Sequence, residues 1–153
     1  MSDHGIEGVV VTELRVIADQ RGAVLHMIRA DAPEFTKFGE LYFSEVLPGS
    51  VKAWKRHTRQ TQTFAVPAGR IQIVIYDDRP GSGTRGTLQV LELGRPDRYC
   101  RLRIPPGLWY GFACLGATPA LIANYADLPH DLTESELRSV DDASIPHAWR
   151  NKN

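Results

Sequence analysis

Short runs of hydrophobic residues alternate with turn-forming residues along most of this chain. The runs are rich in β-branched and aromatic residues, and glycine- or proline-containing clusters such as 78–83 separate them, which is typical of strands joined by turns. They lie at 9–11, 14–17, 23–28, 41–47, 51–57, 63–66, 71–76, 88–93, 99–104, 109–114 and 120–125. Many short strands at close spacing predict an all-β fold, built as an antiparallel sandwich or a closed barrel.

The segment after residue 130 has a different pattern, and it predicts a short helix. Asp131 or Thr133 is expected to cap this helix, which should end near Arg138. Glu134 and Glu136 would then lie near its positive end, where a carboxylate is favourable. The predicted architecture is therefore a barrel followed by a short C-terminal helical segment.

The run 51–57 carries the most informative alternation. Successive side chains of a strand point to opposite faces. One face should therefore hold Val51, Ala53, Lys55 and His57, and the other Lys52, Trp54 and Arg56. If the first face looks into a barrel, a lysine and a histidine share its interior. A buried lysine is costly unless it is paired or loses its proton, so this pair indicates a functional pocket.

Composition narrows the class of protein. A chain of 153 residues is expected to form one domain, spanning 1–153. Its 18 basic and 18 acidic residues balance, which argues against a nucleic-acid-binding protein. No apolar run reaches membrane-spanning length, and the N-terminus lacks a signal-peptide pattern. Two cysteines do not make a disulfide framework, so we expect a cytoplasmic protein with no membrane partner.

Two segments have a spacing that indicates a site inside the barrel. Lys55, His57 and Gln62 lie between glycines at 49 and 69, and a second segment, 105–110, ends in Tyr110. These positions resemble the two motifs of cupin barrels, whose slots normally supply histidines and a glutamate to a metal. Lysine, glutamine and tyrosine are not ligands that zinc or iron prefers. We therefore expect a jelly-roll barrel with no metal and no cofactor.

The chain also resembles one family within this fold, the dTDP-4-dehydrorhamnose 3,5-epimerases, from about residue 19 to 149. Four segments carry the resemblance. They are the Asp-Gln-Arg-Gly turn at 19–22, the segment 54–57, the strand 71–79 that ends in Asp-Asp-Arg, and Ile-Pro-Pro-Gly-Leu-Trp-Tyr-Gly-Phe at 104–112. The last of these is the most specific. The resemblance implies a nucleotide-sugar substrate and a homodimer that exchanges N-terminal strands.

Site roles follow from the matched positions. The resemblance places the family's catalytic base at His57 and its phosphate-binding arginine at Arg21, with Arg79 a second phosphate contact. Where the family has an arginine, a lysine and an acid tyrosine, this chain has Trp54, Gln62 and the neighbourhood of Asn124. Tyr125 is the nearest phenol, and the family's second-motif histidine is replaced by Tyr110. The family's base is oriented by an aspartate from a C-terminal extension, and we expect Glu45 or Asp142 to replace it.

These residues suit proton transfer beside a carbonyl. Such a reaction needs a base for the acidic C–H, a donor to the developing enolate oxygen and an acid that returns the proton. His57 is the predicted base, because imidazole titrates near working pH. Lys55 is the predicted partner of the enolate and should also lower the pKa of His57 by repulsion. Tyr110 or Tyr125 is expected to return the proton.

Three functions remain open from the sequence. The first is epimerisation or isomerisation of a nucleotide-activated 4-keto deoxysugar in deoxysugar or polysaccharide biosynthesis. The second is a non-catalytic cupin that binds a sugar or small metabolite. The third is 3,4-ketoisomerisation, which also requires only proton shuttling.

Overall fold

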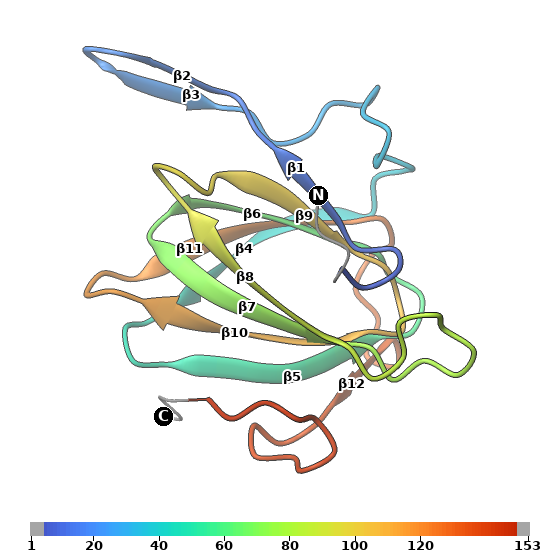
Figure 1. Cartoon of the computed structure of the whole chain (residues 1–153). Helices are drawn as coiled ribbons and strands as arrows, with labels where there is room; N and C mark the ends of the chain where they lie inside the picture. The colour runs from blue at the N-terminus through green and yellow to red at the C-terminus, as the bar shows by residue number, and fades with distance from the viewer. Residues whose placement is uncertain (1–4, 150–153) are drawn as a thin grey trace.

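The computed structural model describes residues 5–149, which form a barrel of two facing antiparallel sheets and a projecting hairpin (Figure 1). The strands are β1 (Val10–Glu13), β2 (Val16–Asp19), β3 (Gly22–Leu25), β4 (Glu40–Val46), β5 (Val51–His57), β6 (Gln62–Ala68), β7 (Arg70–Tyr76), β8 (Leu88–Gly94), β9 (Cys100–Ile104), β10 (Trp109–Leu115), β11 (Ala120–Ala126) and β12 (Ser135–Leu137). The first sheet has the order β1-β9-β6-β11-β4 and the second β12-β5-β10-β7-β8, while β2 pairs with β3.

The predicted all-β class is confirmed, and the predicted C-terminal helix is wrong. No helix occurs within residues 5–149. The segment expected to be helical instead adds β12 to the edge of the second sheet, where Ser135 faces His57 and Leu137 faces Lys55. Pairing with an exposed strand edge satisfies backbone groups that a short isolated helix would leave to water.

The core fills most of the space between the sheets. Strand β7 shows the alternation, because Ile71, Ile73 and Ile75 enter the core while Val74 faces the opposite side. The inner cluster also contains Val46, Phe64, Val66, Leu93, Leu102, Ile104, Phe112 and Ile122. Burying each large apolar side chain contributes about 1.5–3 kcal/mol, so this cluster stabilises the barrel around the remaining cavity.

The C-terminal segment covers the outer side of the second sheet. There Trp54, Trp109, Ile145 and Trp149 form a second apolar cluster, with the rings of Trp54 and Trp149 5.4 Å apart. The hairpin β2–β3 lies apart from both sheets (Figure 1) and pairs only with itself among the described strands. Cys100 and Cys114 are buried and form no disulfide. Within residues 5–149 there is no helix with the length and hydropathy to cross a membrane.

Candidate active site

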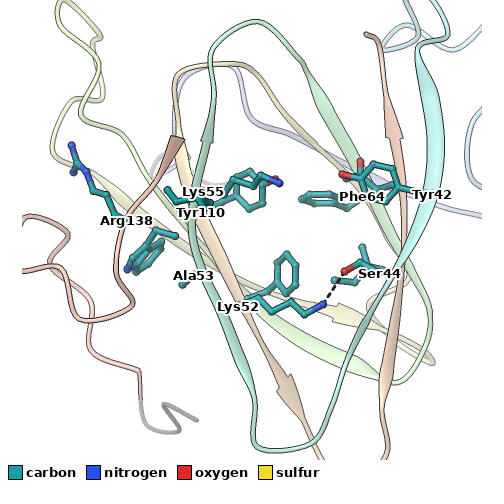
Figure 2. Close-up of a pocket in the computed structure, with 13 residues that line it drawn as sticks. Tyr42, Ser44, Lys52, Ala53, Lys55, Phe64, Tyr110 and Arg138 are labelled. Carbon is teal, nitrogen blue, oxygen red and sulfur yellow. Dashed lines mark hydrogen bonds between the residues drawn. The ribbon is translucent and has the colours of Figure 1, made fainter. Parts of the chain in front are cut away.

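A cavity of about 390 Å³ lies between the two sheets, within the size range of small-molecule sites. Four of its polar groups come from β4 and β5, namely Tyr42, Ser44, Lys52 and Lys55. The remaining wall includes Phe64, Tyr110, Phe112, Ile122 and Asn124. Figure 2 shows Lys52 reaching across to Ser44, while Arg138 lies on the other side of β5. The cavity is therefore an apolar chamber with a few convergent polar groups.

A bulge in β5 decides which side chains enter this cavity. Tyr110 pairs with Lys55 and Gly111 with Ala53, so Trp54 is an extra residue on its strand. A Cβ at Gly111 would lie 2.5 Å from the Cβ of Ala53, which explains the glycine at this close approach. Because of the bulge, Lys52 lines the cavity together with Lys55. The expectation from strict alternation, which put Lys52 on the opposite face, is wrong.

Three side chains form a continuous hydrogen-bonded chain that begins at Tyr110 in the cavity wall. His57 is buried; its Nδ1 lies 2.6 Å from Oε1 of Glu134, and its Nε2 lies 2.9 Å from the hydroxyl of Tyr110. The other carboxylate oxygen of Glu134 accepts the backbone N–H groups of Arg59, at 2.7 Å, and Gln60, at 2.6 Å. Glu134 therefore holds the imidazole in one orientation.

Glu134 is the functional candidate that sequence reasoning missed. The carboxylate was expected from Glu45 or Asp142, but Glu45 is exposed and Asp142 accepts from Ser144. Glu134 reaches His57 because β12 pairs with β5, which is a contact across 77 positions of sequence. No local pattern indicates such a pairing, and the same acidic residues instead suggested a helix start.

The environment favours a neutral imidazole beside an ionised carboxylate. Burial lowers the pKa of His57, outweighing the raising effect of Glu134, and the positive charge of Lys55 lowers it further. Burial alone would raise the pKa of Glu134, but the hydrogen bonds from Gln60, His57 and Arg59 outweigh it and the net pKa lies below the usual range. A neutral imidazole held by an ionised carboxylate is an arrangement that can accept a proton.

The ammonium groups of Lys52 and Lys55 have fewer hydrogen-bond partners than the imidazole of His57. The Lys52 ammonium lies 3.3 Å from the Ser44 hydroxyl. The Lys55 ammonium forms no hydrogen bond or ion pair with any residue between 5 and 149. Over the same residues, no group of three or more histidines, cysteines, aspartates and glutamates could hold a metal ion. An ammonium in a largely apolar chamber favours an anionic ligand or a developing negative charge.

An amide network supports the wall opposite β5. Asn124 lines the cavity and donates to the Tyr42 hydroxyl and to Gln62, both at 2.7 Å. Gln62 donates in turn to Gln60 at 2.7 Å and lies behind Asn124, outside the cavity lining. The Oδ1 of Asn124 is buried without a hydrogen-bond partner in the described part of the chain. The side-chain oxygen of Asn124 is therefore an unsatisfied acceptor in a residue that lines the cavity.

Two predicted site residues, Arg21 and Arg79, lie away from the cavity. Arg21 is in the hairpin and pairs with Asp19. Arg79 is held in a turn by Asp77 and donates to the carbonyl of Glu7.

Trp54 borders the cavity, but its ring packs in the outer cluster. Tyr125 follows Asn124 on β11 and so points to the opposite face, where its hydroxyl donates to the carbonyl of Lys37 and its ring stacks on Phe35. Of the predicted residues, Lys55, Tyr110 and Asn124 thus line the cavity with their polar groups, and His57 is hydrogen-bonded to Tyr110.

Comparison with known proteins extends this description. A family model described as dTDP-4-dehydrorhamnose 3,5-epimerase matches residues 3–152. A dTDP sugar isomerase from Desulfovibrio desulfuricans, known from its crystal structure, is 56% identical in sequence to this chain. The match covers 94% of this chain and 92% of the isomerase chain, with a TM-score of 0.92. The probable low-salt glycan biosynthesis epimerase Agl13 of Haloferax volcanii is 39% identical, covering 93% of this chain and 88% of the relative. The spore coat polysaccharide biosynthesis protein SpsL of Bacillus subtilis is 32% identical, covering 94% and 96%.

Proposed function

The chain belongs to the dTDP-4-dehydrorhamnose 3,5-epimerase family, and on that premise we propose that it epimerises or isomerises a dTDP-activated 4-keto sugar with His57 as the base. The observation that carries the proposal is the buried pair of His57 and Glu134, which is hydrogen-bonded through His57 to Tyr110 in the wall of a cavity that also holds Lys55. The names of the two curated relatives support a place in glycan or polysaccharide biosynthesis.

The proposed chemistry is proton exchange beside the C4 carbonyl. A proton leaves C3 or C5 towards His57, and the electron pair of the broken C–H bond forms an enolate. The Lys55 ammonium stabilises the enolate oxygen, which matches the absence of a hydrogen bond or ion pair from this ammonium to any residue between 5 and 149. Return of a proton from the opposite face inverts the carbon. No redox step occurs, so the reaction requires no cofactor.

Deuterium incorporation tests this function directly. We expect NMR of a dTDP-4-keto-6-deoxyhexose incubated with the protein in D₂O to show enzyme-dependent exchange at C3, C5 or both. His57→Gln, which keeps a hydrogen-bonding side chain, should slow the exchange by about 10²–10⁴-fold. Absence of exchange with the wild-type protein would remove the enzymatic proposal. Exchange at the wild-type rate in His57→Gln would remove His57 as the base.

A 3,4-ketoisomerase is a second candidate, favoured by the name of the 56% identical relative, which is a sugar isomerase. It would use the same base but move the carbonyl from C4 to C3. The same NMR experiment separates the two reactions, because ketoisomerisation moves the ¹³C carbonyl resonance to C3, whereas epimerisation leaves it at C4.

We also propose that the chain acts as a homodimer in which the hairpin β2–β3 contacts the partner subunit. Ile17 and Val24 in this hairpin are 47% and 59% exposed, and Phe43 on the barrel is 62% exposed, which leaves apolar surface for such a contact. Arg21 would then reach the phosphates of a substrate in the partner's cavity. Light scattering should give twice the mass of 17.1 kDa, and Arg21→Ala should raise KM. A monomer at working concentration would contradict the proposal.

A further inference from the structure

Both ring nitrogens of His57 already have hydrogen-bond partners in the protein. Glu134 is ionised and also accepts two backbone N–H groups, so Nδ1 of His57 must carry the proton that it donates to Oε1. Nε2 is then the unprotonated nitrogen, with one lone pair. That lone pair accepts the hydroxyl of Tyr110 at 2.9 Å. A substrate C–H therefore has no free nitrogen to approach.

Tyr110, in contrast, borders the cavity. Its side chain is part of the cavity wall, whereas His57 is not among the lining residues. Figure 2 shows Tyr110 beside Lys55 at the same end of the chamber. A phenol oxygen that donates its proton to His57 keeps lone pairs with which to accept another. The group between the base and any bound sugar is thus a tyrosine hydroxyl.

We propose that Tyr110 takes the substrate proton and relays its own proton to His57 in the same step. This inference rests on the proposed function and assigns the group that touches the substrate. The C–H bond beside the carbonyl breaks, and its electron pair forms the enolate. The proton bonds to the Tyr110 oxygen while the Tyr110 O–H breaks and an N–H forms at Nε2. His57 becomes an imidazolium next to the Glu134 carboxylate, and Tyr110 stays neutral throughout.

Neutrality of Tyr110 explains why both transfers must occur together. Burial raises the pKa of Tyr110 well above that of an ordinary phenol. A free phenolate in this wall is therefore unfavourable, and a stepwise route through it would be slow. The positive charge created by the relay instead rests on His57, where Glu134 stabilises it at 2.6 Å. This geometry gives the histidine its role as a base without direct contact with the sugar.

Deuterium exchange in Tyr110→Phe tests the relay. The substitution removes one oxygen atom and keeps the ring, and we expect exchange to fall by about 10²-fold or more. Tyr99→Phe, at another buried tyrosine outside the cavity lining, is the matched control and should exchange like the wild-type protein. If wild type exchanges, His57→Gln does not and Tyr110→Phe exchanges within threefold of wild type, the relay is overturned while the proposed function stands.

A second measurement uses only the wild-type protein, so it does not depend on a variant folding. In the relay, the exchangeable Tyr110 proton moves while the C–H bond breaks. Loss of the substrate's carbon-bound proton should therefore be slower in D₂O than in H₂O when that step limits the rate. Direct abstraction by His57 moves no exchangeable proton in this step, and an isotope effect of unity on the isolated step would overturn the relay.

Discussion

The polar groups around the cavity fall into two sets that differ in how the protein satisfies them. In the chain Glu134–His57–Tyr110, His57 is bonded on both sides, Glu134 also accepts backbone N–H groups, Tyr110 is bonded to His57, and all three are buried. The Lys55 ammonium has no hydrogen-bond partner within residues 5–149, and the Lys52 ammonium is hydrogen-bonded only to Ser44 among them. Groups that hold the proton are thus fixed in advance, and groups that meet the ligand's charge keep their donors open. Under the proposed function, preorganisation of the first set and availability of the second would both lower the barrier to proton abstraction.

The largest loss of activity is expected from Glu134→Gln, which changes the hydrogen bond that orients His57. Because the backbone N–H groups of Arg59 and Gln60 require an acceptor, the amide oxygen should take their side and the amide NH₂ should face His57. The imidazole would then carry its proton on Nε2 and could not act as a base. We expect kcat to fall by about 10²–10⁴-fold, as when an orienting carboxylate is replaced in other acid–base sites.

Glu136→Gln is the matched control for that substitution. Glu136 lies two positions away on β12 and pairs with Arg56, outside the cavity lining. We expect near wild-type kcat for Glu136→Gln, with unchanged pH dependence. Equal losses in the two variants would mean that β12 matters for folding only, and that Glu134 does not position the base.

A smaller effect is expected from Lys55→Met. Removing the enolate's partner should lower kcat by about 10²–10³-fold, the usual loss for one oxyanion donor. Since the charge of Lys55 lowers the pKa of His57, its removal should move the acid limb of kcat/KM to higher pH. Residual activity in Glu134→Gln should move in the opposite direction, because Glu134 raises that pKa. Lys55→Arg, which keeps the charge, should leave the limb in place, and a limb unchanged in Lys55→Met would contradict the electrostatic role.

Sequence patterns were sufficient to predict part of this site, namely the residues on β5 and β10. Alternation and turn signals gave the strands, and motif spacing placed Lys55, His57 and Tyr110 near one another. The expectation that Tyr125 returns the proton was wrong, although alternation argues against it: Asn124 faces the cavity, so its neighbour on the strand points to the opposite face.

The rest of the site depends on contacts that are distant in sequence. The bulge at Trp54 requires the close approach of Gly111 on β10, and it turns Lys52 inward. Glu134 lies beside His57 only because β12 pairs with the edge of β5, which overrides the local preference for a helix start. Register against a partner strand is not encoded in a single strand's pattern, so neither feature was predictable.

A change confined to binding is expected from Lys52→Met. Figure 2 shows Lys52 beside Ser44 and away from Tyr110 and Lys55, so under the proposed function we expect it to pair with a phosphate of the nucleotide. We expect KM to rise about tenfold with kcat almost unchanged, because a charge-assisted hydrogen bond contributes about 1.5–3 kcal/mol. Lys37→Met, at an exposed lysine outside the cavity, should change neither constant. A loss in kcat equal to that of Lys55→Met would abolish the distinction between the two lysines.

The smallest expected effect is the pH dependence of stability. Because the pKa of His57 lies below its usual value of 6.5 in the folded protein, the unfolded chain binds more protons as the pH falls. The contribution of His57 to stability is therefore complete above pH 6.5 and is lost as the pH drops towards its folded pKa. Glu134, whose pKa is also lowered from 4.5, adds a further loss below pH 4.5. Melting temperatures at pH 7.5 and 5.5 should show a smaller decrease for His57→Gln than for wild type, at about 2–4 °C for each kcal/mol.

His147, whose pKa is lowered by burial in the outer cluster, contributes to stability over the same pH range. His147→Gln is therefore the control, and only the His57 substitution should remove both this pH dependence and the exchange activity. An identical decrease in wild type and His57→Gln would show that the imidazole is not held neutral by the fold.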